Sequence, residues 1–590
     1  MNRHQRRLAT KTATKTATKT GASAPPSLAA ELFQRALREQ DAGALAEAAR
    51  LYKRVLALTP AHGATHNNLA CVLLAQGKRA EASEHFACAI EAAPELLDDL
   101  SGVLAILRDI VPALTAAAGR AEAAWPQRLG IDAAFGADFA AVAADPLLAT
   151  VLTTTTLRDL AMEHLFTGLR REALTRASAI MTSNDAQQER TRPSDLAFYG
   201  ALAQQCFIND YVFALTPDED AAVTALDEAL AARLRGGSGH GVAALAVLAL
   251  AMYRPLGTLA DIDAIAGKPW PKPLRDVIAQ QVSEPRMERE LSAAIATLTP
   301  IADDVSRRVR DQYEENPYPH WVLCAAPRPP LPLERQLRGK FPAARLEPLR
   351  TETPDVLIAG CGTGRHAIEL AQSLPGGSAV LAIDLSRASL GYAIRKTPRE
   401  LSIDYAQADI LGLDALGRAF DLISAMGVLH HMADPLAGWR ILTGLLRPQG
   451  IMHLGLYSET ARQPVTEARA LIAELNYRAT PADIRRARLA LAERNHPVTR
   501  WGDFYSMSDC RDLLFHVEEH RFTLARIEAA LDELGLRFLG FELGPRDGAL
   551  CREAFARAGR PMTDLAHWQT IEAEHPDLFA GMYQFWVQKV

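Results

Sequence analysis

Residues 355–371 read DVLIAGCGTGRHAIELA, and this stretch decides the fold of the C-terminal half of the chain. A short apolar run ends in Gly360, Gly362 and Gly364, and a pattern typical of a helix follows directly. A strand that turns into a helix is the unit from which parallel sheets are built. Because glycine has no Cβ, the backbone amides and the helix N-terminus at this turn can face a polar ligand. We therefore expect a ligand here.

The sequence after this turn keeps alternating between strands and helices. Short apolar segments recur at 379–385, 402–409, 420–426 and 451–457, with helical patterns between them. This alternation predicts a parallel sheet covered by helices on both faces. Ligands of such sheets collect at the carboxyl ends of the strands, which is where the glycine turn lies.

The glycine spacing argues against two common nucleotide-binding turns. A P-loop needs Gly-Lys-Ser/Thr, but Gly364 is followed by Arg365 and His366. A dinucleotide-binding turn, G-x-G-x-x-G, needs glycine at the position of Arg365. The spacing present is G-x-G-x-G.

That spacing, within DVLIAGCGTGRHAIEL, resembles motif I of the class I S-adenosylmethionine-dependent methyltransferases. The resemblance covers roughly residues 305–590 and implies a Rossmann-like, seven-stranded methyltransferase sheet. LRFLGFEL (536–543) and MYQFWVQK (582–589) would be its last two strands, the final one antiparallel. S-adenosylmethionine is then the implied cofactor, and methyl transfer is the implied activity.

The resemblance also assigns roles to individual residues. Asp384 ends the second strand, where the family has an acidic residue that binds both ribose hydroxyls, and Asp409 with Ile410 would lie beside the adenine. The implied cofactor-binding residues are Gly360, Cys361, Gly362, Gly364, Asp384, Leu385, Asp409, Ile410 and Met426. The alternatives are a tight packing turn without a ligand for the glycines, and helix N-caps or turn residues for the two aspartates.

His430 and His431 follow the fourth strand in GVLHH, where methyltransferases of the ubiquinone and menaquinone pathway type also carry a histidine pair. Methyl transfer needs a general base only when the acceptor is protonated, and either histidine could be that base. The alternative is a loop histidine that is hydrogen-bonded to the backbone.

Aromatic residues and prolines are mixed in DQYEENPYPHWVLCAAPRPPLP, residues 311–332. Each proline fixes φ and removes a hydrogen-bond donor, so we expect this stretch to be a linker or an ordered lid rather than a helix, within a segment that spans residues 306–345. Tyr313, Tyr318, His320 and Trp321 could fold over the cofactor or pack against the preceding helical domain.

A long insertion, residues 457–535, separates the fifth and sixth strands and is a candidate wall for the acceptor site. Within it HVEEH places His516 and His520 four residues apart, in the order of an inverted zinc-protease motif. No third ligand is evident, and the flanking residues indicate an amphipathic helix, so we expect no metal site.

An internal repeat marks the N-terminal region. Residues 34 positions apart match in the pairs Ala36/Ala70, Gly43/Gly77, Ala48/Ala82, Tyr52/Phe86 and Pro60/Pro94. Small and large residues at this period resemble two tetratricopeptide repeats, and with a closing helix they would occupy residues 27–120. Helix-period spacing without strand alternation predicts an all-helical domain at 121–305. The basic, Thr-rich residues 1–26 indicate a disordered tail, although Lys11, Lys15 and Lys19 could also align on a helix against an anionic surface.

Composition limits the function further. The chain has 590 residues and a net charge of −6, so we expect several domains and no binding to nucleic acid. Seven scattered cysteines without a C-x-x-C pair indicate a reducing, cytoplasmic location. The apolar stretch 241–253 is too short to span a membrane, so it predicts a buried core helix and no membrane partner.

Two functions follow from these patterns. The first is a methyltransferase whose repeats and helical domain recruit a protein partner or the substrate. The second is a tetratricopeptide scaffold that carries a non-catalytic S-adenosylmethionine-binding domain.

Overall fold

The computed structural model describes residues 27–182, 192–235, 243–325, 327, 329–341, 344–349 and 352–590. The chain divides into two compact units, Met1–Ser283 with Trp321–Ala326, and Glu284–His320 with Pro327–Val590. The expected basic tail at 1–26 and nearly all of the glycine-rich stretch at 235–241 lie outside the described residues.

The first unit begins with two helical hairpins. Their helices are α2 (Leu28–Asp41) with α3 (Leu45–Leu58) and α4 (Gly63–Ala75) with α5 (Arg79–Ala92). Gly43 and Gly77 occupy equivalent turns with φ of 78° and 77°, a left-handed conformation that glycine adopts without strain. The sequence period of 34 is thus also a period of structure, while the tetratricopeptide assignment stays a prediction.

The rest of the first unit is helical at every described element. Its α-helices are α6 (Leu100–Ile110), α7 (Pro112–Ala124), α8 (Ile131–Phe135), α9 (Phe139–Ala143), α10 (Pro146–Thr154), α11 (Leu160–Thr182), α12 (Pro193–Ile208), α13 (Pro217–Arg235), α14 (Ala244–Ala251), α15 (Ile262–Ala266) and α16 (Lys272–Ile278). Residues 245–251 of α14 are all buried, as expected of a core helix. In the described ranges, no single helix is both long enough and apolar enough to cross a membrane.

The second unit is built on a sheet that has eight strands among the described residues, in the order β1-β4-β3-β2-β5-β6-β8-β7. The strands are β1 (Ala296–Thr297), β2 (Asp355–Ala359), β3 (Ala379–Asp384), β4 (Asp404–Gln407), β5 (Phe420–Met426), β6 (Leu446–Leu456), β7 (Leu536–Phe541) and β8 (Tyr583–Lys589). β1 to β6 pair in parallel, and β8 is antiparallel to both β6 and β7. The chain reverses order at β2, next to β5, which is the switch point where ligands bind.

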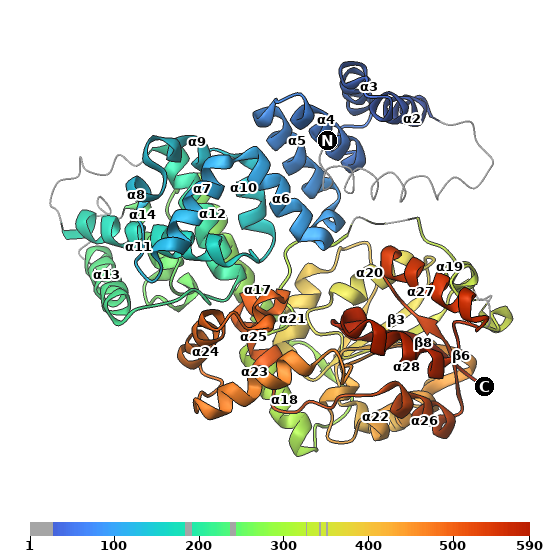
Figure 1. Cartoon of the computed structure of the whole chain (residues 1–590). Coiled ribbons are helices and arrows are strands. Elements are labelled where there is room, and N and C mark those ends of the chain that lie inside the picture. Colours follow the sequence, from blue (N-terminus) through green and yellow to red (C-terminus); the bar gives the residue numbers. More distant parts are fainter. Residues whose placement is uncertain are drawn as a thin grey trace. The chain divides into compact units, whose positions relative to one another are not determined.

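Helices cover both faces of this sheet (Figure 1). The α-helices of the second unit are α17 (Glu284–Ala293), α18 (Asp304–Glu315), α19 (Leu333–Arg338), α20 (Arg365–Ser373), α21 (Arg387–Lys396), α22 (Pro435–Leu445), α23 (Gln463–Glu474), α24 (Pro481–Glu493), α25 (Met507–Phe515), α26 (Leu524–Leu534), α27 (Pro545–Ala558) and α28 (Leu565–Glu574). Residues of α22, α26, α27 and α28 share one buried cluster with the sheet, and residues of α19, α20 and α21 share the other.

The structure corrects the predicted sheet and its boundary. Each of the seven expected segments forms a strand, but β1 adds an eighth at the edge, where Ala296 pairs with Ala406. A strand of two residues has no detectable alternation, so the sequence pattern missed it. The second unit therefore begins at Glu284 rather than after residue 305.

The expected lid and insertion are only partly as predicted. Residues 311–315 continue helix α18, and 333–338 form α19, so the segment 306–345 is not free of helix. The insertion 457–535 holds α23 to α26 and lies between β6 and β7, as the sequence predicted.

Candidate active site

A cavity of about 360 Å³ opens at the carboxyl ends of the parallel strands, beside the glycine turn. Every residue that lines it belongs to the second unit. From the predicted set it contains Gly360, Cys361, Gly362, Asp384, Leu385, Asp409, Ile410, Met426, His431, Tyr313 and Tyr318. Gly364, His430, His320 and Trp321 are not among its lining residues.

The three glycines are required by the geometry of the turn. Gly360, Gly362 and Gly364 have φ of 71°, 52° and 85°, in the left-handed region. A Cβ on Gly360 would lie 2.3 Å from Val428 Cγ2, and a Cβ on Gly362 would lie 2.7 Å from the Tyr318 carbonyl oxygen. Gly364 instead packs against Ala393, which explains why it does not reach the cavity.

The amides of this turn do not face a ligand as the sequence led us to expect. The N–H groups of Gly360 and Cys361 both donate to the Ile383 carbonyl at 2.8 and 2.9 Å, and that of Gly362 donates to Asp384 Oδ2 at 2.8 Å. The turn is therefore tied to the end of β3. Its glycines give the ligand room rather than a set of free donors.

Asp384 closes β3 and points into the cavity. Its Oδ2 accepts from Gly362 N–H, and its Oδ1 accepts from Ser386 N–H at 2.9 Å. Burial raises the pKa of Asp384 to about 6, although these two backbone hydrogen bonds oppose that rise. Each carboxylate oxygen keeps a further lone pair, so the ionised group can still accept two hydroxyl hydrogen bonds.

Asp409 caps a helix and also lines the cavity. Its side chain caps the 3-10 helix Ile410–Leu416 by accepting from Leu411 N–H at 3.0 Å. Its backbone is held by Thr299, whose hydroxyl oxygen accepts from Asp409 N–H at 2.7 Å. Asp409 and Ile410 nevertheless line the cavity beside Leu385, at the end of β4 next to β3.

Two of the four predicted lid residues cover the cavity. Tyr313 comes from the last turn of α18, and Tyr318 follows it with its ring 6.2 Å from that of Tyr313. Thr363 Oγ1 donates to the Pro319 carbonyl, which holds the lid against the glycine turn. His320 stacks on Tyr392 with centroids 5.7 Å apart, and Trp321 belongs to the first unit, so neither residue lines the cavity.

The two adjacent histidines lie in different surroundings. His430 is fully buried, and its ring stacks on Tyr457 with centroids 3.8 Å apart. His431 lines the cavity, and burial lowers the pKa of its imidazole, so it is neutral at pH 7. Its Nδ1 lies 2.7 Å from the Glu518 carbonyl oxygen, which can only accept, so Nδ1 carries the hydrogen and Nε2 has the lone pair. Of the two, only His431 can act as a base in the cavity.

A series of hydrogen bonds next to His431 runs from the Glu518 backbone through His516 and Tyr313 to Asp512. Glu518 N–H donates to His516 Nδ1 at 3.1 Å, so Nε2 of His516 carries the hydrogen and donates to Tyr313 Oη at 3.1 Å. The Tyr313 hydroxyl in turn donates to Asp512 Oδ1 at 2.7 Å. Burial, aided by Asp512, raises the pKa of Tyr313 well above its usual value, so this hydroxyl keeps its proton.

His431, Asp512 and His516 place possible ligand atoms within 4.8 Å of one another, yet their geometry does not suit a metal ion. The His431 and His516 rings stack at 3.6 Å with 21° between their planes, so their in-plane lone pairs run nearly parallel and cannot meet at one ion. His516 also has its hydrogen on Nε2, the atom that would have to ligate.

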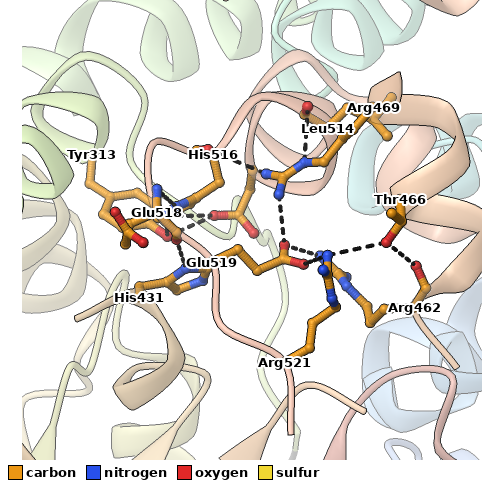
Figure 2. Close-up of polar contacts among 11 residues, drawn as sticks. Tyr313, His431, Arg462, Thr466, Arg469, Leu514, His516, Glu518, Glu519 and Arg521 are labelled. Carbon is orange, nitrogen blue, oxygen red and sulfur yellow. Dashed lines mark hydrogen bonds and ion pairs between the residues drawn. The ribbon is translucent and has the colours of Figure 1, made fainter. Parts of the chain in front are cut away.

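The predicted helix through HVEEH is wrong. Helix α25 ends at Phe515, and residues 516–522, which we name the strap, form an irregular segment beside His430, His431 and Tyr457. Figure 2 shows His516, Glu518 and Glu519 of the strap pointing toward different partners. His516 and His520 therefore do not share a helical face.

Several cavity residues were missed in the sequence, among them Tyr457, Asp512 and Met582. Tyr457 directly follows β6, so the rule that ligands lie at the carboxyl ends of strands could have found it. Asp512 sits within α25 and Met582 just before β8, and neither position carries a local signal.

Comparison with known proteins gives a family match inside this region. Residues 356–450 match the family model described as a methyltransferase domain. They include the glycine turn, Asp384, Asp409 and His431. The match falls in the region that the sequence analysis compared with the S-adenosylmethionine-dependent methyltransferases.

Individual relatives match smaller parts of the chain. An uncharacterized protein of Synechococcus sp. is 28% identical over 255 residues, which is 41% of this chain and 61% of the relative. A ubiquinone biosynthesis O-methyltransferase of Methylocella silvestris is 34% identical over 123 residues, 21% of this chain and 47% of the relative. The chain thus spans only about half to three fifths of the length of these curated relatives. Among solved structures, PKMT2 from Rickettsia typhi in complex with AdoHcy matches with a TM-score of 0.32 at 17% identity, over 40% of this chain and 48% of that one.

Proposed function

We propose that the chain is an enzyme that binds S-adenosylmethionine in this cavity and transfers its methyl group to an acceptor with a dissociable proton. One observation carries the proposal: the cavity brings together the glycine turn, Asp384 and Asp409 within the methyltransferase match at 356–450. The bound cofactor would supply an electrophilic methyl group on a sulfonium.

The binding residues divide the cavity into three parts. The Asp384 carboxylate accepts from the ribose hydroxyls, and Asp409, Ile410 and Leu385 enclose the adenine. The glycine turn, covered by Tyr318 and Pro319, leaves space for the amino-acid end of S-adenosylmethionine. Covering this end with the lid excludes water and fixes the donor, and orientation of this kind lowers the barrier by several kcal/mol.

His431 is the base in this proposal. An acceptor O–H or N–H in this part of the cavity would give its proton to Nε2 of His431 as the acceptor takes the methyl group that the bound cofactor would supply. Asp512 and His431 both offer lone pairs to this part of the cavity, so an acceptor that brings hydrogen-bond donors fits it. A positioned base of this kind typically contributes about 10²–10⁴ in rate.

The N-terminal hairpins have a proposed role in recruitment. The repeat period of 34, with Gly43 and Gly77 in equivalent turns, supports two tetratricopeptide repeats at residues 27–120. Repeats of this kind present surfaces to protein partners. The helical region that follows would then bring a partner or the substrate to the enzyme.

The test is calorimetric titration of the full chain with S-adenosylmethionine. We expect wild type to bind at sub-millimolar ligand and Asp384→Ala to bind at least tenfold more weakly. Because Asp384 is protonated below its pKa of about 6, wild-type affinity should also fall roughly tenfold from pH 7 to pH 5, whereas the variant should show no such loss. Asp384→Asn, which keeps the shape of the side chain, checks that the loss is not due to misfolding.

Catalysis is tested separately from binding. Tritium transfer from methyl-labelled S-adenosylmethionine into a size-fractionated cell lysate should label either proteins or small molecules. Binding without transfer would favour a non-catalytic scaffold. No heat of binding in wild type would contradict both functions.

A further inference from the structure

The backbone of one residue, Glu518, determines the protonation pattern of two stacked imidazoles. The Glu518 carbonyl accepts from His431 Nδ1 at 2.7 Å, while the N–H of the same residue donates to His516 Nδ1 at 3.1 Å. The two rings are therefore held in opposite tautomers, with the lone pair on Nε2 in His431 and the hydrogen on Nε2 in His516. If the Glu518 backbone moved, neither ring would be restricted to one tautomer.

The strap that carries Glu518 has no regular secondary structure to hold it. At its C-terminal end, His520 N–H donates to the His430 carbonyl at 2.7 Å and Phe522 N–H donates to the Tyr457 carbonyl at 2.8 Å. At its start, Arg469 Nη2 donates to the His516 carbonyl at 3.3 Å. Between these points the Glu518 backbone bonds to the His431 and His516 rings, and the Glu519 side chain joins the strap to Arg462 and Arg469.

The Glu519 carboxylate is buried between arginines of helix α23 and the turn before it. Its side chain is 1% exposed, and Oε2 lies 2.5 Å from Arg462 Nη2 and 3.4 Å from Arg469 Nη1. The Arg462 side chain is itself 3% exposed and lies over the Tyr457 ring at 3.7 Å. Figure 2 shows Glu519 reaching from the strap toward these arginines while Glu518 stays beside His431 and His516.

A buried carboxylate of this kind has few alternative positions. Moving it away would separate two buried charges, the Glu519 carboxylate and the Arg462 guanidinium, and breaking a buried pair of this kind is strongly unfavourable. Glu519 therefore holds the strap at one place relative to helix α23. Since Glu518 is the preceding residue, its peptide group is held as well.

On the basis of the proposed function, we infer that Glu519 is a positioning residue that holds the Glu518 peptide group and so keeps Nε2 of His431 unprotonated and directed at the methyl acceptor. It does not touch the cofactor or the acceptor, because it is not among the residues that line the cavity. Its effect reaches the reaction only through the tautomer of His431.

The conservative change Glu519→Gln tests this inference because it keeps the size of the side chain and removes its charge. We expect the strap to shift and His431 to exchange between its two neutral tautomers. The measurement is imidazole nitrogen NMR of the full chain labelled with ¹⁵N-histidine and saturated with S-adenosylmethionine. The wild-type signal, assigned by its loss in His431→Asn, should show a protonated Nδ1 and an unprotonated Nε2, and Glu519→Gln should show averaged nitrogens.

A matched control is available in the first unit. Glu219 is also buried, with its side chain 2% exposed, and pairs with Arg128. Glu219→Gln should destabilise the chain without changing the His431 signal. Glu519→Asp, which keeps the charge, should restore part of the wild-type tautomer.

Rate and affinity give a second readout. In Glu519→Gln the initial rate of tritium transfer into lysate should fall by roughly 10- to 100-fold, while the affinity for S-adenosylmethionine stays within about twofold of wild type. An unchanged His431 tautomer in Glu519→Gln, or a loss of cofactor affinity as large as the loss of rate, would overturn the inference. If wild type transferred no label, the proposed function would fail, but the tautomer measurement would still decide whether Glu519 holds His431.

Discussion

At the scale of single residues, Gly362 connects three parts of the candidate site. Its N–H donates to Asp384 Oδ2, its φ of 52° requires a left-handed backbone, and the place of its missing Cβ is 2.7 Å from the Tyr318 carbonyl. Asp384, the turn and the lid therefore all depend on one glycine. No side chain fits there unless the lid moves.

The change Gly362→Ala should therefore weaken binding as well as stability. We expect the free energy of unfolding to fall by about 1–3 kcal/mol and the affinity for S-adenosylmethionine to fall at least tenfold, because the lid must move away. Thermal unfolding and calorimetric titration measure the two effects. Gly417→Ala is the matched control, since Gly417 also has a positive φ of 63° but meets no atom within 4 Å. Equal affinities in the two variants would contradict this account of the lid.

At the scale of elements, the lid docks through helix ends as well as through its aromatic rings. Glu314, in the last turn of α18, accepts from Arg387 N–H at 2.6 Å and from Ala388 N–H at 3.1 Å, at the first turn of α21. Ser386 Oγ donates to the Tyr313 carbonyl at 3.1 Å. A carboxylate at a helix N-terminus is favoured by the unpaired N–H groups and by the helix dipole.

The change Glu314→Ala should loosen the lid without removing any residue that lines the cavity. Loss of a helix cap costs about 1–2 kcal/mol, so we expect S-adenosylmethionine to dissociate roughly tenfold faster. Displacement of the tritiated cofactor by unlabelled cofactor measures this rate. Asp311→Ala removes an exposed acid from the same helix and should leave the rate unchanged. Equal dissociation rates in both variants would show that the docking of α18 does not retain the cofactor.

At the scale of the whole molecule, the cavity is assembled from segments that are far apart in the sequence but belong to one unit. Its lining runs from Ser306 to Met582 and includes no residue of the first unit. Each unit has buried residues of its own, so the cofactor stabilises the second unit directly by mass action.

Hydrogen exchange should map this division. Addition of S-adenosylmethionine should slow amide exchange in peptides from 306–319, 358–369, 384–389, 408–410 and 426–432, because these segments contain the cavity lining. Peptides from 28–92 serve as the internal control and should exchange at the same rate with and without the cofactor. Protection confined to those control peptides would contradict the assigned site.

What the sequence determined by itself is what depends on neighbours along the chain. A strand, a glycine turn and a helix follow one another locally, so Gly360, Gly362, Asp384 and Asp409 could be placed at the ends of their strands from spacing alone. The repeat at 34 residues is local in the same sense. The tautomers of the histidines, by contrast, had no signal in the sequence.

Only the tertiary structure decided which side chains complete the site. Asp512 lines the cavity from within α25, which ends at Phe515, and the strap after it bonds to His430, His431 and Tyr457 rather than to the preceding helical turn. The residues that flank HVEEH, 511–515 and 521–524, predicted one amphipathic helix, because a sequence pattern does not contain the partners that compete for the backbone. His431 and His430, adjacent in sequence, differ for the same reason: burial and hydrogen-bond partners come from distant segments.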